Sequence, residues 1–152
     1  MKTIFINKNL ENNERSCACI GYFDAFHLGH QKLIEKTIQK AEQNSVKSAL
    51  ICFDPDPFDI ISGVRNPHLF SFEERKELAA SFGIDLFYVI TFDKELMNMP
   101  DTVFIDTYLN RMNLMELVCG FDFSFGYKGK GNPQLLSEKG EFKVNIVDEY
   151  GR

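Results

Sequence analysis

Two histidines that lie three residues apart carry the strongest chemical signal in this sequence. His27 and His30 flank Gly29, where an apolar run ends and a helical pattern begins. The first turn of a helix presents unpaired N–H groups and a partial positive charge, and a glycine lets an anion approach the backbone. Imidazoles at such a turn can donate hydrogen bonds to phosphate oxygens and stabilise developing charge. The spacing therefore indicates a phosphate-binding turn.

Two other interpretations of this pair are open. The histidines are surface imidazoles that happen to flank a glycine, or they are two ligands of a zinc ion. A zinc site needs at least a third protein ligand. His68 is the only other histidine, and none of the four cysteines lies beside it or in a Cys-x-x-Cys pair. We therefore assign no metal ligand and expect buried, reduced thiols.

Short apolar runs alternate with helical patterns along the chain. Strands are expected at about residues 1–6, 17–21, 48–53, 86–91, 116–120 and 142–147. Helices are expected at about 29–44, 71–82, 101–112 and from 133 onward. Continuous apolar strands that alternate with helices predict an α/β fold with a parallel sheet and helices on both faces. Ligands of such sheets bind beyond the carboxyl ends of the strands.

The expected helix boundaries rest on local capping signals. Ser71 and Glu74 have the spacing of a capping box. Asp101 is expected to cap the helix that extends to Met112, and Asn132 to cap a helix whose first residue is a proline.

Composition limits the possible functions. A length of 152 residues fits one domain, and the formal net charge of −5 argues against nucleic-acid binding, which favours a basic face. No apolar run reaches the ~18 residues of a membrane span, and the first residues lack a signal-peptide core. We expect a cytoplasmic domain with neither a nucleic-acid nor a membrane partner.

Three segments, in order, resemble the bacterial FAD synthetases, the FMN adenylyltransferase part of the bifunctional riboflavin kinase/FAD synthetase family. They are GYFDAFHLGHQKLI, CFDPDP and VCGFDFSFGYKGKGN, and the similarity extends from about Cys17 to Asn132. The resemblance implies a Rossmann-like, doubly wound sheet of the HxGH nucleotidyltransferase type. It also implies one adenylyltransferase domain over residues 1–152, with the family's C-terminal riboflavin kinase domain outside this chain.

The resemblance implies a role for each matching residue. The catalytic residues are His27 and His30, which contact the ATP phosphates. The nucleotide-binding residues are Gly21, Phe23, Asp24 and Gly29. The flavin-binding residues are Pro55, Pro57, Asp122, Phe123, Phe125 and Asn132.

The third segment favours the same assignment by its own chemistry. Phe121, Phe123 and Phe125 alternate and can present a flat apolar wall to an isoalloxazine ring. Lys128 and Lys130, among glycines, form a basic flap suited to phosphates. The alternatives are phenylalanines of the core and a solvated hairpin tip.

The reaction that the resemblance implies is transfer of AMP from ATP to FMN, giving FAD and pyrophosphate, with Mg²⁺ entering with ATP. Two alternatives stay open. One is an HxGH nucleotidyltransferase for another phosphate substrate, such as pantetheine phosphate or glycerol phosphate. The other is a truncated module that binds a flavin or a nucleotide without turnover.

The sequence departs from the family pattern at three places. Ala25 stands where the family has glycine, and Asp56 replaces the histidine between the two prolines. The family continues with an Ile-Ser-Ser-Thr-x-Ile-Arg segment, and the printed sequence ends at Arg152 before it. We expect a natural chain that continues, and impaired turnover without that segment.

Overall fold

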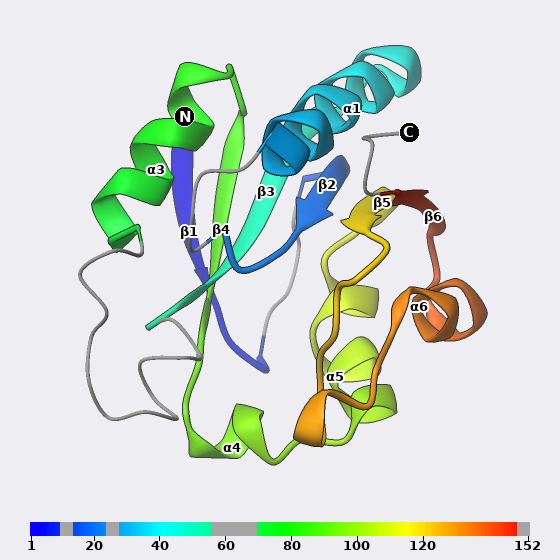
Figure 1. Ribbon diagram of the computed structural model, residues 1–152. Coiled ribbons are helices and arrows are strands. Elements are labelled where there is room, and N and C mark those ends of the chain that lie inside the picture. The colour runs from blue at the N-terminus through cyan, green and yellow to red at the C-terminus, as the bar shows by residue number, and fades with distance from the viewer. Residues whose placement is uncertain (10–13, 24–27, 56–69, 149–152) are drawn as a thin grey trace.

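A six-stranded parallel sheet forms the centre of the computed structural model, which describes residues 1–9, 14–23, 28–55 and 70–148 (Figure 1). The strand order is β1-β4-β3-β2-β5-β6. The strands are β1 (Lys2–Ile6), β2 (Ser16–Ile20), β3 (Lys47–Asp54), β4 (Leu86–Thr91), β5 (Leu114–Gly120) and β6 (Lys143–Val147). All neighbouring strands pair in parallel, as the apolar runs predicted.

Helices cover both faces of the sheet. They are α1 (Leu28–Asn44), α3 (Phe72–Ser81), α4 (Lys94–Met97), α5 (Asp101–Thr107) and α6 (Pro133–Lys139), with 3₁₀ turns η1 (Leu109–Arg111) and η2 (Tyr127–Gly129). Side chains of α1 and α3 share one apolar core with the sheet, and those of α4, α5 and α6 share the other. The fold is the expected α/β, Rossmann-like arrangement. In the described parts of the chain, no helix combines the length and apolar character that a membrane span requires.

The central strands β2, β3 and β5 are buried on both faces, which explains their continuous apolar runs. All four cysteines lie on these strands and are buried as free thiols, as expected. Burial raises the pKa of Cys19, Cys52 and Cys119 to about 12. These thiols therefore stay protonated near neutral pH and pack as small apolar groups.

The capping signals at two helices are confirmed. Ser71 Oγ accepts a hydrogen bond from Glu74 N at 3.2 Å, and Glu74 Oε1 accepts one from Ser71 N at 3.1 Å. Asn132 Oδ1 accepts from Leu135 N at 2.9 Å, with Pro133 in the first turn of α6.

The helix expected from Asp101 to Met112 is wrong at both ends. It begins one position early, because the carbonyl of Pro100 already accepts the bond from Phe104 N at 3.0 Å. Pro100 is the N-cap residue, and its extended backbone has no side-chain cap. The Asp101 carboxylate instead accepts from the adjacent Thr102 N at 2.7 Å.

The same helix ends at Thr107, and a tighter turn follows. Arg111 N donates to Tyr108 O at 3.2 Å, a three-residue hydrogen bond of the 3₁₀ type. The chain then reverses at Asn113, whose φ of +56° is in the left-handed region, and enters β5 at Leu114. This reversal replaces the last helical turn that the apolar pattern predicted.

Candidate active site

Two cavities lie where the carboxyl ends of the central strands open. The first has a volume of about 620 Å³ and lies among the ends of β2, β5 and β6 and the start of α1. Its described lining residues are Ile20, Gly21, Tyr22, Phe23, His30, Leu33, Gly120, Phe121, Asp122, Phe123, Ser124, Val147 and Asp148.

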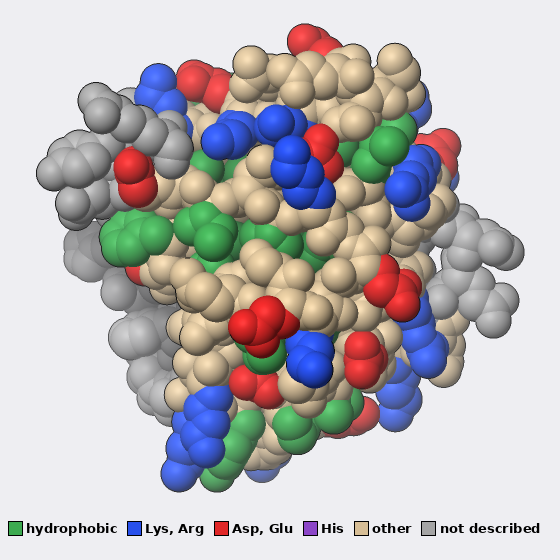
Figure 2. Space-filling model, turned by 90° about the vertical axis from the view of Figure 1, so that its right-hand side faces the viewer, with side chains coloured by type: hydrophobic (Ala, Val, Ile, Leu, Met, Phe, Trp, Pro, Cys, Tyr) green, Lys and Arg blue, Asp and Glu red, His purple; other side chains and the backbone are tan. Residues whose placement is uncertain are grey.

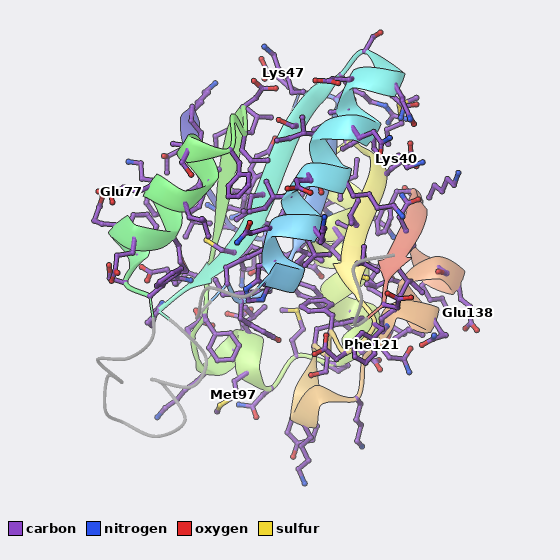
Figure 3. All side chains as sticks on the ribbon, turned by 45° about the horizontal axis from the view of Figure 1, so that its top comes forward. Lys40, Lys47, Glu77, Met97, Phe121 and Glu138 are labelled. Atoms are coloured by element: carbon purple, nitrogen blue, oxygen red, sulfur yellow. The ribbon has the colours of Figure 1, made fainter. Side chains whose placement is uncertain are left out.

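The second cavity has a volume of about 440 Å³ and is lined mainly by aromatic rings and loop backbone. Its described lining residues are Tyr22, Phe53, Phe92, Leu96, Met97, Asn98, Phe104, Ser124, Phe125, Gly126, Tyr127, Lys128 and Gly129. In Figure 3, Phe121 beside the first cavity and Met97 beside the second lie toward one end of the molecule, and Lys47 lies at the other.

Tyr22 and Ser124 line both cavities and form the wall between them. The Tyr22 hydroxyl donates a 2.6 Å hydrogen bond to the Ser124 carbonyl. The Tyr22 ring packs between Phe53, at a centroid distance of 5.1 Å, and Phe123, at 5.7 Å. The wall therefore joins the turn after β2 to the loop after β5.

The residues after β2 and the first turn of α1 bring three sequence-predicted residues to the first cavity. Gly21 N donates to Ile51 O at 3.3 Å, and a side chain on Gly21 would meet the Phe23 ring at 3.2 Å. Phe23 is buried with a φ of +49°, a strained conformation for a residue with a large side chain. Its ring lies 5.2 Å from the ring of His30, in the first turn of α1. Such strain clusters at functional turns.

A sequence model of the FAD synthetase family matches residues 9–152 of this chain. The chain belongs to the FAD synthetase family. The resemblance expected from the three segments is thereby confirmed.

Relatives of this FAD synthetase domain include bifunctional riboflavin kinase/FMN adenylyltransferases. The protein from Listeria monocytogenes is 34% identical over 157 residues, covering 98% of this chain and 50% of the relative. The one from Bacillus subtilis is 31% identical over 144 residues, covering 91% of this chain and 46% of the relative. The chain thus spans about half the length of the curated relatives it matches.

A solved structure has the same fold. The crystal structure of a macrolide-efflux protein from Streptococcus pneumoniae superposes with a TM-score of 0.81 and 27% sequence identity. The match covers 97% of this chain and 50% of that one.

Several of the family's signature residues lie outside the described residues. They are Asp24, His27 and Pro57, together with the departures Ala25 and Asp56. Gly29 is the second residue of α1, so it lies in the first turn of that helix, as expected. The roles of these residues stay predictions.

The predicted flavin residues are divided between different places in this FAD synthetase domain. Asp122 and Phe123 line the first cavity, and Phe125 lines the second. The rings of Phe123 and Phe125 are buried and stack on each other with a centroid distance of 5.6 Å. They therefore contribute to the core as well as to the cavities, and they do not form one wall of a single cavity.

Pro55 and Asn132 are not among the residues that line either cavity. Pro55 is exposed directly after β3. The Asn132 side-chain oxygen is engaged as the cap of α6. Direct contact of these two side chains with a flavin remains a prediction.

The lysines of the predicted flap flank an aromatic ring. Lys128 Nζ lies 5.3 Å and Lys130 Nζ 6.0 Å from the centre of the Tyr127 ring. Tyr127 and Lys128 line the second cavity, so the flap belongs to the aromatic side of the site. On the side of the molecule that carries β6 and α6, basic and acidic side chains are interspersed (Figure 2).

Arg75 is a residue of the site region that the sequence did not single out. It lies in the run Glu-Glu-Arg-Lys-Glu of α3, which is typical of a solvated helix face. Its side chain is 2% exposed and forms a 3.2 Å ion pair with Asp54, at the carboxyl end of β3. Arg75 lies three residues after the half-buried Phe72 and four before the buried Ala79, and this spacing is the signal of burial that the sequence offered.

Proposed function

We propose that this chain transfers AMP from ATP to FMN, producing FAD and pyrophosphate. The match of the FAD synthetase family over residues 9–152 carries the proposal. The relatives from Listeria monocytogenes and Bacillus subtilis are named as FMN adenylyltransferases, which supports the same reaction.

In this proposal ATP occupies the first cavity and the flavin ring occupies the second. Both cavities have volumes typical of sites for small molecules. The first offers the backbone of Gly21 and the imidazole of His30 near the start of α1, which suits phosphates. The second offers aromatic rings, which suit a planar heterocycle.

The reaction then takes place near the shared wall. An oxygen of the FMN phosphate attacks the α-phosphorus of ATP, a new P–O bond forms, and the bond to the pyrophosphate leaving group breaks. No covalent intermediate with the protein is needed. His30, His27 and the N-terminus of α1 stabilise the charge that develops on the phosphate oxygens, and the cavities hold the two reactants in line.

Mg²⁺ is expected to enter with ATP. Among the described residues, no three His, Cys, Asp or Glu side chains converge as a metal site. Mg²⁺ is commonly held by substrate phosphates and one or two carboxylates. Asp122 and Asp148 line the first cavity and are the carboxylates that fit this arrangement. When bound, the ion neutralises phosphate charge.

We also propose that a riboflavin kinase domain accompanies this domain in the same protein. The support is the bifunctional name of the relatives, of which this chain covers about half. The open reading frame that contains this sequence tests the point, because the proposal requires it to encode a riboflavin kinase domain as well.

The proposed reaction is tested with a panel of acceptors. FMN, pantetheine phosphate and glycerol phosphate are each supplied with ATP or CTP, and the products are separated by chromatography. FAD and pyrophosphate from FMN and ATP alone are expected. Faster transfer to another acceptor would reassign the chain within the HxGH enzymes, and binding of FMN and ATP without any transfer would make it a binding module.

A further inference from the structure

The Arg75 guanidinium is bonded on several sides although it is nearly excluded from solvent. Nε donates to the Ser71 carbonyl at 3.4 Å, and Nη2 donates to Asp54 Oδ1 at 3.2 Å. Nη1 donates to the Phe53 carbonyl and, at 3.5 Å, to the Tyr22 carbonyl. A buried cation needs such partners, because an unpaired charge in the interior is costly.

Three of these partners, Tyr22, Phe53 and Asp54, belong to two separate segments of the proposed site. Tyr22 lies two residues after the end of β2, and Phe53 and Asp54 end β3 just before Pro55 of the CFDPDP segment. Strands β2 and β3 are neighbours in the sheet, and the bond from Gly21 N to Ile51 O is formed where they separate. Beyond that bond, the Arg75 side chain links the segment after β2 to the end of β3.

The chemistry of arginine suits this link. Its planar guanidinium presents donors in fixed directions, so one side chain can bond three backbone carbonyls and a carboxylate at once. A lysine ammonium carries the same charge but is a compact point donor and does not reproduce the fork. Arg75 lines neither cavity in the described structure, so its effect on a ligand passes through the residues it holds.

We propose that Arg75 is a positioning residue, which sets the turn after β2 and the end of β3 relative to each other. The inference rests on the proposed adenylyl transfer. Tyr22 is part of the wall between the cavities, and its ring packs on Phe53, so a shift of either loop changes the distance between the two reactants. A displacement of about 1 Å can lower a rate about 100-fold.

The test compares Arg75→Lys with Arg111→Lys in the complete natural protein. Arg111 is exposed and also donates to a backbone carbonyl, that of Lys8, at 3.1 Å. For Arg75→Lys we expect kcat for FAD formation to fall about 10- to 100-fold per folded molecule, with KM for ATP and FMN within about threefold of wild type. Arg111→Lys should keep the wild-type kcat. A purely structural role would lower the melting temperature and leave kcat per folded molecule unchanged, which would overturn the proposal.

Hydrogen exchange supplies a readout that does not depend on turnover. In Arg75→Lys, exchange should accelerate in peptides that contain Tyr22 and Phe53 and stay unchanged in β6; unchanged exchange at both loops would contradict the inference. If Arg75→Lys does not fold, Arg75→Met decides, because it keeps an unbranched side chain of similar length and removes every donor to the Tyr22 and Phe53 carbonyls. An unchanged kcat there overturns the proposal.

A wild-type protein that forms no FAD would overturn the proposed function together with this inference, whereas an active wild type matched by Arg75→Lys would overturn the inference alone.

Discussion

The two ends of the sheet use buried polar groups in opposite ways. Toward the amino ends of β5 and β6, the buried carboxylate of Glu116 accepts hydrogen bonds from the side-chain amides of Asn44 and Asn145. At the carboxyl ends, the turn after β2 and the loop after β5 enclose two cavities with His30 and Asp122 in the lining of the first. The same strands therefore carry a closed polar cluster at one end and an open site at the other.

The pKa of Glu116 shows what this difference means. Burial acts to raise it, but the hydrogen bonds from Asn145 and Asn44, together with the positive charges of Lys40 and Lys143, leave the pKa below its ordinary value. The cluster thus satisfies its own charge and contributes stability. A buried carboxylate is by itself no sign of function; the polar groups that face a cavity are the ones available to a ligand.

The largest expected effect is at the carboxyl end. His30→Ala should lower the rate of FAD formation about 10²- to 10³-fold, because a donor to the transferring phosphate is lost, and His27→Ala should do the same. The half-buried ring at the start of α1 contributes little to folding. Gln39→Ala, at an exposed position of the same helix, is the control for kinetic assays. Near-wild-type rates in both histidine variants would contradict the proposed contact of these histidines with the phosphates.

Loss of an aromatic ring from the second cavity should weaken flavin binding and spare ATP. Phe92 is half-buried and meets the Phe53 ring edge-on at 6.3 Å, so Phe92→Ala removes a lining ring with little of the core. We expect FMN binding to become weaker by about 1–3 kcal/mol, measured by quenching of flavin fluorescence. Phe5→Ala, at a 64% exposed ring on β1, serves as the control. If the affinity for ATP fell instead, the assignment of ATP and FMN to the two cavities would have to be reversed.

A change at the amino end should affect stability and not activity. Glu116→Gln should lower the free energy of unfolding at pH 7 by about 1–2 kcal/mol, since charged hydrogen bonds are lost. Because the folded pKa lies below the ordinary 4.5, the stabilisation is present above that pH and disappears as the pH falls through the folded value. Unfolding in urea at several pH values measures the difference. Glu138→Gln, at an exposed site labelled in Figure 3, should change little.

The smallest effect is expected at the wall between the cavities. Tyr22→Phe keeps the ring between Phe53 and Phe123 and removes only the hydroxyl that bonds the Ser124 carbonyl. A loss of about 0.5–1.5 kcal/mol in stability is expected, with both ligands still bound. Tyr22→Ala, which also removes the ring, should weaken both. If Tyr22→Phe and Tyr22→Ala bound both ligands equally well, the Tyr22 ring would have no role in the wall.

Much of the fold could be predicted from local sequence. Continuous apolar runs identified the buried parallel strands, and Ser71 and Asn132 marked helix starts correctly, because capping depends on residues three positions apart. The short helix α4 was missed, although Asp93 caps it by accepting from Leu96 N at 2.9 Å. Four residues carry too weak a periodicity to be recognised.

The arrangement of the site was less predictable, because it depends on contacts between distant segments. Neighbouring phenylalanines in the loop after β5 end in different cavities, since Phe123 packs on Tyr22 and Phe125 packs on Phe104. Arg75 resembled a surface charge, and only the juxtaposition of β2 and β3 explains its burial. No pattern within one segment reports such contacts.

The most direct test of the two-cavity account is whether both substrates bind at once. FMN affinity is measured by fluorescence quenching with and without saturating α,β-methylene-ATP, in which the bond to be broken is blocked. The account predicts a ternary complex: FMN binds with similar or higher affinity when the nucleotide is present, and Phe92→Ala weakens FMN in both titrations. Competition between FMN and the analogue for a single site would contradict it.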